Sequence, residues 1–289
     1  MAETRLEIAK KDIVGTFESD PRRVFRRRDI EQILAQEREF WRLAQSTTFS
    51  AFVDFLAQKT PLHEVRFDLP YKPTLRYVWG DAPLFEIVQS LRPEGYFCHY
   101  TAVFLHGFTN QIPKRIYLND EQQNRGGGGE LTQVGIDRAF RGKCRTSNNI
   151  ASFRDYSICV VNGQNTNCLG VENVEAMDGS HVRVTTVERT LIDIAVRPIY
   201  SGGVHEVLNA YASARDHVSV NRLGAMLKRL NFTYPYHQAI GFYLERAGCS
   251  PEQLDLLKRF ELNFDFYLAH SMGETEYVEQ WRLFVPKGL

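Results

Sequence analysis

Apolar residues recur at helical spacing in three successive segments near the start of the chain, residues 6–18, 30–40 and 49–56. The first pattern stops at Asp20-Pro21, because proline disfavours helical backbone in the residue before it. Asp29 is expected to cap the second segment, and a hydroxyl of Thr47, Thr48 or Ser50 is expected to cap the third. The pattern therefore predicts three helices.

The period then changes from helical to alternating. Residues 64–69 and 75–79 alternate polar with apolar side chains, and Pro70 and Pro73 lie between the two runs. Alternation of this kind predicts two strands that each bury one face, joined by a turn. Three helices followed by a hairpin is the element order of a winged helix-turn-helix domain, which we place at residues 1–80.

The middle of the chain holds shorter patterns. Helices are expected at 84–91 and at 96–107, the second closed by Gly107, and strands at 114–119, 139–140, 156–161 and 174–177. The dipeptides Asn162-Gly163 and Asp178-Gly179 favour tight turns after the last two strands, and the second turn leads into 181–184. Four consecutive glycines at 126–129 predict a mobile loop, because ordering them loses much backbone entropy.

Helical patterns dominate the C-terminal third. Thr185 and Glu188 have the spacing of a capping box, before a helix that ends ahead of Pro198. Ser250 and Gln253 repeat this spacing. Amphipathic helices are expected at 204–214, 220–230 and 236–247, and closing strands at 264–268 and 281–285. We therefore expect an α+β chain, with a larger mixed α/β domain at residues 81–289.

Composition narrows the class of protein. The 289 residues suit two domains, and 43% hydrophobic with 24% charged residues is typical of globular chains. Because 35 Lys and Arg balance 35 Asp and Glu, a nucleic-acid surface has to be local. The charged start lacks the apolar core of a secretory signal, and no run approaches the roughly 18 apolar residues of a membrane span. We expect a cytoplasmic protein without a membrane partner.

Five cysteines show no CxxC pair and no regular framework. They are expected to be reduced, structural thiols. Closely spaced Cys or His pairs, which a zinc site needs, are missing, so we expect neither a metal nor another cofactor.

Five arginines crowd into seven residues ahead of the second predicted helix: Arg22, Arg23, Arg26, Arg27 and Arg28. On one face, such guanidinium groups would neutralise DNA phosphates. The alternative is a solvated charge run, because Asp20, Asp29 and Glu31 lie nearby. The winged-helix order favours the DNA interpretation.

The third predicted helix is the candidate recognition helix. Polar side chains at its start would reach base edges in the major groove: Gln45, Ser46, Thr47, Thr48 and Ser50. The hairpin would contact the DNA backbone or minor groove through Lys72, Thr74 and Arg76.

Two further groups of residues carry candidate chemistry. His99 and His106 lie seven residues apart, about two helical turns, and an apolar surround favours packed histidines over metal ligands. In the string Glu-Arg-Thr-Leu-Ile-Asp, helix caps and an ion pair between Arg189 and Asp193 explain Glu188, Arg189 and Asp193 better than catalysis does. We interpret these five residues as structural.

Motifs typical of enzymes are missing: there is no GxSxG, no HExxH and no phosphate-binding loop. A nuclease of the restriction type needs an acidic residue followed by Glu-x-Lys to hold its metal ion, and Glu261 and Asp265 lack that partner. We expect no catalytic residues. A winged-helix-targeted DNA nuclease with a degenerate metal site at Glu261 and Asp265 stays open as an alternative.

Two strings, LRPEGYFCHYTAVFLHGFT at 91–109 and VTTVERTLID at 184–193, resemble motifs of the AbiEi family of type IV antitoxins. Residues 202–204, 264–268 and 281–286 are also similar, in the same order, so the resemblance spans residues 24–289. It implies a regulator whose winged helix binds operator DNA to repress its own operon. It also implies a C-terminal antitoxin domain that neutralises a nucleotidyltransferase-like toxin encoded beside it, directly or indirectly. A ligand-sensing transcription factor is a second alternative.

Overall fold

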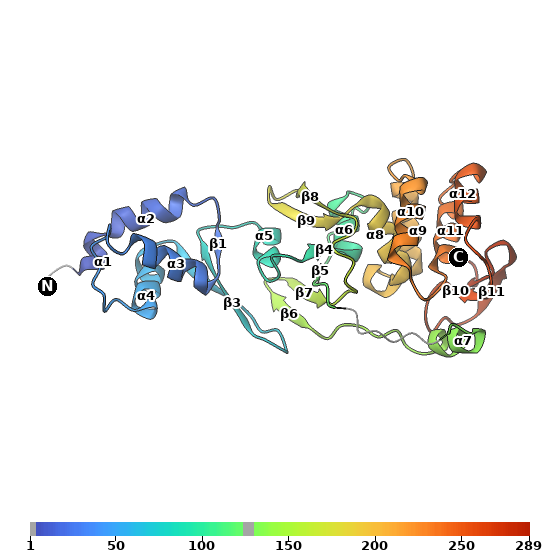
Figure 1. Ribbon diagram of the computed structural model, residues 1–289, viewed down its shortest axis with the longest axis horizontal. Coiled ribbons are helices and arrows are strands. Elements are labelled where there is room, and N and C mark those ends of the chain that lie inside the picture. The colour runs from blue at the N-terminus through green and yellow to red at the C-terminus, as the bar shows by residue number, and fades with distance from the viewer. Residues whose placement is uncertain (1–3, 124–129) are drawn as a thin grey trace.

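The computed structural model describes residues 4–123 and 130–289; the glycine run at 126–129, predicted to be a mobile loop, lies outside them. The chain is elongated, with a helical N-terminal unit at one end, a six-stranded sheet in the middle and a helical C-terminal unit at the other end (Figure 1). Each part of the chain combines helices with a sheet, without a regular alternation of helix and strand, which agrees with the α+β class that the sequence predicts.

The N-terminal unit contains α1 (Arg5–Ile8), α2 (Lys10–Ser19), β1 (Val24–Phe25), α3 (Arg27–Glu37), α4 (Phe49–Lys59), β2 (Leu62–Phe67) and β3 (Thr74–Trp79). The three strands pair antiparallel in the order β1-β3-β2. The predicted cap of α4 is confirmed, because the Thr48 hydroxyl accepts from the Ala51 N–H. The cap of α3 was predicted wrongly: Asp29 lies inside its first turn and accepts from the Arg26 N–H at 2.7 Å.

The β2–β3 hairpin joins two hydrophobic cores, because its alternating side chains point to opposite sides. Tyr77 and Trp79 pack with α2, α3 and α4, and the Trp79 ring stacks on Phe17 at 4.8 Å. On the other face, Val65 and Phe67 belong to the core of the central sheet. The predicted domain boundary at residue 80 thus follows a hairpin that is buried on both faces.

The central sheet has the order β6-β7-β5-β4-β9-β8. Its strands are β4 (Tyr96–Phe97), β5 (Arg115–Asn119), β6 (Ile150–Phe153), β7 (Tyr156–Val161), β8 (Val171–Glu175) and β9 (His181–Thr185). The predicted hairpin at Asp178-Gly179 is confirmed as β8–β9. The predicted turn at Asn162-Gly163 does not form a hairpin, because β7 pairs with β5 and β6 instead of β8.

Two short helices, α5 (Leu84–Gln89) and α6 (His99–Leu105), accompany the sheet. The helix predicted over 96–107 is shorter than expected, because Tyr96 and Phe97 are drawn into the sheet between β5 and β9. Gly107 follows the helix with φ 73° and closes it as predicted.

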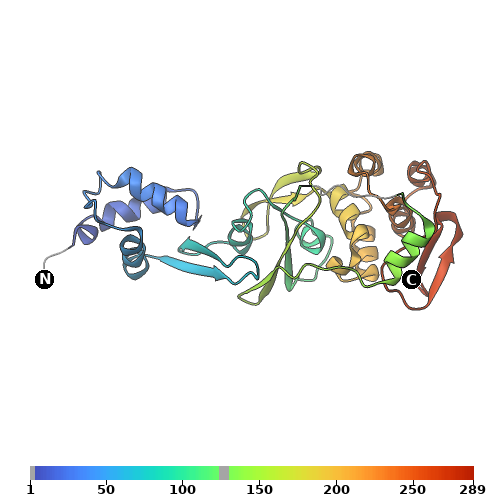
Figure 2. The same ribbon diagram turned by 60° about the horizontal axis from the view of Figure 1, so that its bottom comes forward.

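The C-terminal unit is mainly helical: α7 (Gln133–Arg141), α8 (Val187–Val196), η1 (Pro198–Ser201), α9 (Val204–Ala214), α10 (Val220–Leu230), α11 (Tyr236–Arg246) and α12 (Pro251–Lys258). A small sheet closes it, formed by β10 (Phe266–Tyr267), β11 (Thr275–Val278) and β12 (Leu283–Pro286), with η2 (Glu279–Trp281) between the last two strands. Figure 2 shows α7 beside this C-terminal sheet.

Three local predictions in this unit have clear outcomes. Residues 139–140 were predicted as a strand but belong to α7, which Thr132 caps. The capping box predicted at Thr185 and Glu188 does not form: Thr186 is the N-cap, and its hydroxyl accepts from the Arg189 N–H, whereas Glu188 accepts from the Ser219 N–H. The capping box at Ser250 and Gln253 is confirmed.

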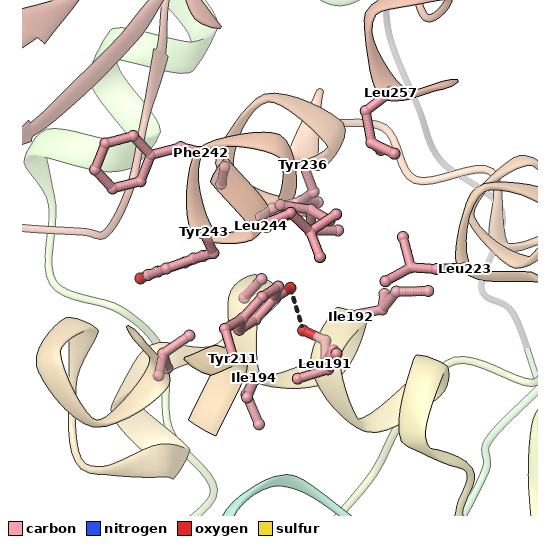
Figure 3. Close-up of a cluster of buried hydrophobic side chains, with 14 of the residues drawn as sticks. Leu191, Ile192, Ile194, Tyr211, Leu223, Tyr236, Phe242, Tyr243, Leu244 and Leu257 are labelled. Atoms are coloured by element: carbon pink, nitrogen blue, oxygen red, sulfur yellow. Dashed lines mark hydrogen bonds between the residues drawn. The ribbon is translucent and has the colours of Figure 1, made fainter. Parts of the chain in front are cut away.

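The core of the C-terminal unit forms where α8, α9, α10 and α11 meet (Figure 3). Tyr211 and Tyr243 stack at 5.0 Å, and the buried Tyr211 hydroxyl donates to the Leu191 carbonyl at 2.8 Å. This bond satisfies a hydroxyl that would otherwise be buried without a partner. It also fixes α9 against α8, the helix that carries the Glu-Arg-Thr-Leu-Ile-Asp string. Among the residues described, no helix has the length and apolar character that crossing a membrane requires.

Candidate nucleic-acid interface and central cleft

The arginine run lies around β1 and the start of α3, and part of its charge is neutralised. Arg22 pairs with Asp20 at 2.7 Å, Arg26 pairs with Asp29 at 2.9 Å and Arg27 pairs with Glu31 at 2.7 Å. The side chain of Arg28 is 71% exposed, and its distance to Asp29 is 4.0 Å. Arg23 is half-buried, and its backbone N–H donates to Glu86. Arg27 and Arg28 are therefore the arginines of this run that extend furthest into solvent.

The fold brings the arginine run to the start of α4. The Arg27 guanidinium lies over the Phe49 ring, 4.5 Å from its centroid. Phe49 is the first residue of α4, so Arg27 is adjacent to the predicted base-reading positions. Four of these are exposed: Gln45, Ser46, Thr48 and Ser50. Thr47 is half-buried, and its carbonyl accepts from Arg38 at 3.0 Å.

The hairpin tip lies away from this surface. The Tyr71 hydroxyl donates to Asn148 at 2.7 Å, and Phe67 packs on Phe153 at 5.0 Å, so the hairpin is docked on the loop before β6 and on β6 itself. Both ribbon views show its tip directed away from α4 (Figures 1 and 2). Lys72 is exposed at this tip, and Thr74 is half-buried behind it. The structure does not bring these two residues together with the arginine run.

Arg76 was predicted to contact DNA, but the structure buries it. It is 8% exposed. It lies on the face of β3 that packs against the central unit, which consists of the six-stranded sheet with α5 and α6. Its guanidinium donates to the Ser90 carbonyl and to the Leu75 carbonyl, both at 2.7 Å. Burial lowers the pKa of Arg76 to about 10, which still leaves it charged at neutral pH. These bonds hold the hairpin to α5, so Arg76 is removed from the predicted DNA-contacting set.

A polar cleft of about 580 Å³ opens in the middle of the molecule, next to the central sheet. The parallel strands β5 and β7 end in it, at Asn119 and Val161. Its other walls are the start of α6, the loop before β6, α8, η1 and the connection from α10 to α11. The space beyond the carboxyl ends of parallel strands is where α/β sheets usually bind ligands.

His99 lies in the wall of this cleft at the first position of α6. It is 9% exposed, has a positive φ of 51°, and packs against Tyr200 with ring centroids 5.0 Å apart. Burial lowers its pKa to about 4, so the imidazole is neutral at pH 7. Its Nδ1 has no hydrogen-bond partner among the described residues. A buried and unpartnered polar atom next to a cleft is unusual in a folded protein.

Arg189 and Asp193, one turn apart on α8, also line the cleft. They form an ion pair with Nε and Oδ1 2.8 Å apart, and the side chains are 8% and 12% exposed. Arg189 also donates to the Leu169 carbonyl at 2.7 Å. Although burial opposes the charge, attraction to Asp193 raises the pKa of Arg189 above its ordinary value. The predicted i, i+4 pair is confirmed, and it lies at a cleft that its spacing could not reveal.

The other two residues interpreted as structural lie elsewhere. Glu188 is buried, accepts from the Ser219 N–H at 3.0 Å and pairs with Arg222 at 2.8 Å, which ties α8 to α10. His106 follows α6, and its Nε2 lies 2.6 Å from the Thr185 carbonyl. His99 and His106 therefore have different surroundings.

Several cleft residues were not predicted from the sequence. Arg145 and Arg197 line it with Asn149 and Tyr200, and none of them belongs to a periodic pattern. Glu121, close by, accepts from the hydroxyl of Tyr96, itself in the cleft wall, at 2.9 Å. Despite partial burial, hydrogen bonds from Thr166 hold the pKa of Glu121 below its usual range. These residues come from a strand, a 3-10 helix and loops that are far apart in the sequence, so no sequence signal could have grouped them.

Both carboxylates of the alternative nuclease centre have protein partners in the structure. Asp265 accepts from the Tyr277 hydroxyl at 2.6 Å and pairs with Arg282 at 2.9 Å. Glu261 accepts from Asn263 at 2.7 Å. The described residues contain no group of three or more His, Cys, Asp or Glu side chains placed to hold a metal ion. Asp265 is thus a structural carboxylate that ties η2 and β11 to the start of β10.

Comparison with known proteins identifies the fold alone. No family model and no curated protein matches the chain. The crystal structure of the RV2827C protein from Mycobacterium tuberculosis is similar, with a TM-score of 0.61 at 15% sequence identity. The match covers 98% of this chain and 93% of that one, so the whole arrangement of units recurs in a solved protein.

Proposed function

We propose that the protein is a cytoplasmic transcriptional regulator that binds operator DNA through its N-terminal unit. The observation that carries this proposal is the position of Arg27 over Phe49, 4.5 Å from the ring. It places the exposed arginines of α3 next to the exposed polar start of α4. One surface then offers phosphate-neutralising cations beside side chains that hydrogen-bond to base edges.

The winged-helix domain proposed at residues 1–80 has α4 as its recognition helix. Supporting it are a hairpin that follows the four helices α1 to α4, and a sheet in which β1 pairs with the outgoing strand of the hairpin. Because the hairpin is docked on the central unit through Phe67 and Tyr71, the proposed contacts to DNA come from α3 and α4. Lys72 then has at most a peripheral role.

The test is a mobility-shift titration of the full chain on the DNA upstream of its own gene, at two salt concentrations and against unrelated DNA. Replacing Arg27 and Arg28 with Gln should weaken binding to all sequences. It should also reduce the slope of log K against log salt by about 0.9 for each phosphate that the variant no longer neutralises. Arg259→Gln is the matched control, because Arg259 is exposed and directly follows α12, which lies at the opposite end of the molecule from α3 (Figure 1). An unchanged slope would remove α3 from the interface.

The resemblance to AbiEi antitoxins supports the second part of the proposal, which is neutralisation of a nucleotidyltransferase-like toxin by the unit after residue 80. The toxin is expressed from an unrelated promoter, together with the full chain carrying Arg27→Gln and Arg28→Gln. Rescue of growth by this variant would separate toxin control from repression. Loss of rescue, with the variant folded, would tie toxin control to DNA binding and count against an independent antitoxin domain.

A further inference from the structure

We propose that the central cleft is a binding site for a small organic anion that carries a planar ring. The proposal concerns the central unit and does not depend on DNA binding or on toxin control. Four observations lead to it: the place and size of the cleft, its charge, its unpartnered polar atoms and its aromatic walls.

The place and size of the cleft suit a small molecule. At about 580 Å³ it falls within the range of roughly 300–1,000 Å³ typical of ligand pockets. Asn119 and Val161, the last residues of the parallel strands β5 and β7, form one edge. The Gly163 N–H donates to the Asn119 side chain at 2.9 Å, which fixes the loop after β7 at this edge.

The charge of the cleft is positive. Three arginines line it, and Asp193 is the carboxylate among the described lining residues. Asp193 is already paired with Arg189, which leaves the charges of Arg145 and Arg197 without a carboxylate among the described residues. The Arg197 Nη1 donates to Cys144 at 2.9 Å, whereas its other two nitrogens have no described partner. Two guanidinium groups on one side of a cleft select for a carboxylate or a phosphate.

Two buried polar atoms in the wall have no partner among the residues described: the Nδ1 of His99 and the Oδ1 of Asn149. Their residues are 9% and 7% exposed, and both line the cleft. Side chains of this kind normally find a hydrogen-bond partner when they are buried. A ligand with a donor and an acceptor on its ring would supply partners after a small adjustment of the wall.

Tyrosine rings form much of the remaining surface, contributed by Tyr71, Tyr96, Tyr200, Tyr234 and Tyr236. Tyr200 is fixed by accepting from the Ser147 N–H at 2.7 Å, and it stands 5.0 Å from the His99 ring. Flat walls beside two cations favour a planar ring that carries the negative charge. Tyr71 comes from the tip of the β2–β3 hairpin, so the N-terminal unit contributes directly to this wall.

Isothermal titration calorimetry on the full chain tests the proposal with four probes. Adenosine 5′-monophosphate and benzoate combine a ring with an anion, and adenosine and benzamide are their neutral counterparts. Saturable binding of at least one anion, with the neutral counterpart weaker by about tenfold, is the expected result. A preference between the two anions distinguishes a phosphate from a carboxylate ligand. No binding by either anion up to the low-millimolar range, or equal binding by the neutral compound, would overturn the proposal.

Variants locate the binding. Arg145→Gln should weaken the binding anion by about tenfold and Arg145→Glu should abolish binding, because Arg145 is an exposed lining residue whose replacement leaves the core intact. Arg259→Gln is the control. Arg27→Gln with Arg28→Gln should leave probe binding unchanged, which excludes anion capture by the DNA surface. Binding unaffected by Arg145→Glu would overturn the assignment of the cleft, whereas failure of DNA binding alone would leave it standing.

Discussion

The arginines of the N-terminal unit and the arginine of α8 carry the same guanidinium group in opposite environments. At the start of α3, the side chains of Arg27 and Arg28 are 68% and 71% exposed. On α8, the side chain of Arg189 is 8% exposed and is held by Asp193 and a backbone carbonyl. An exposed charge stays hydrated, so it costs little folding free energy and remains available for a partner. A buried charge loses its hydration and needs a partner to offset that cost.

The exposed arginines are suited to bind a partner, whereas the buried arginine stabilises the fold. Clustered arginines next to an exposed polar helix start suit a surface for a polyanion, because they need no internal partner. A lone arginine in a mostly apolar helix acts as a structural element, because its hydrogen bonds fix the loop at Leu169 against α8.

Replacing Arg189 with Leu should lower the free energy of unfolding by about 4 kcal/mol, because the Asp193 carboxylate would lose its cation in a buried site. Urea unfolding followed by circular dichroism measures the loss. Arg66→Leu is the control, since Arg66 and Asp68 form an exposed ion pair. An equal loss in the free energy of unfolding for both substitutions would show that the burial of Arg189 does not make its ion pair more important for stability.

Arg76→Leu should destabilise the protein by about 3 kcal/mol, because the Ser90 and Leu75 carbonyls would lose charged donors. The same measurement applies. In DNA titrations the variant should keep the salt slope of the parent chain, since Arg76 is buried away from the proposed interface. A flatter slope would return Arg76 to the DNA-contacting set.

His99 should make stability depend on pH. Its folded pKa of about 4 lies below the unfolded value of about 6.5, so the unfolded chain binds more protons between these values. The contribution of His99 to the free energy of unfolding is complete above the unfolded pKa and is lost as the pH falls towards 4. Between pH 7 and pH 5 the loss is about 2 kcal/mol. His99→Asn, which tolerates the positive φ, should remove this part of the pH dependence, and the exposed His181→Gln should not.

Arg27→Gln should leave the urea midpoint unchanged within error. The Arg27 side chain is largely exposed, and its partner Glu31 stays solvated when the ion pair is removed. A clear loss of stability would mean that the contact with Phe49 supports the packing of α4, and that Arg27 belongs to the architecture as Arg189 does.

Local features of the fold could be predicted to a large extent. The hairpin at Asp178-Gly179, the Thr48 cap of α4 and the capping box at Ser250 depend on side chains a few residues apart. The errors arose where a distant segment decides the outcome. Residues 139–140 are helical, and Phe140 packs on Phe266 at 4.8 Å, more than a hundred positions along the chain.

The candidate site residues also differ in whether local sequence or a distant contact decides their role. The arginine run and the polar start of α4 can be identified from neighbouring residues, and the fold places them side by side. Arg76 could not be assigned from the sequence, because the alternation of β3 gives two faces and does not say that both are covered. Val78 on the same face packs into the central core, and this long-range contact buries the guanidinium.

Patterns along the chain are sufficient to predict most helices, most strands, the order of the units and the local concentration of positive charge, whereas α7 was missed. These follow from periodicity, capping and turn chemistry, which act over a few residues. Tertiary structure alone decided the sheet order β6-β7-β5-β4-β9-β8, the docking of the hairpin and the cleft. Each of these depends on which apolar faces bury one another, and segments far apart in the chain satisfy that condition together.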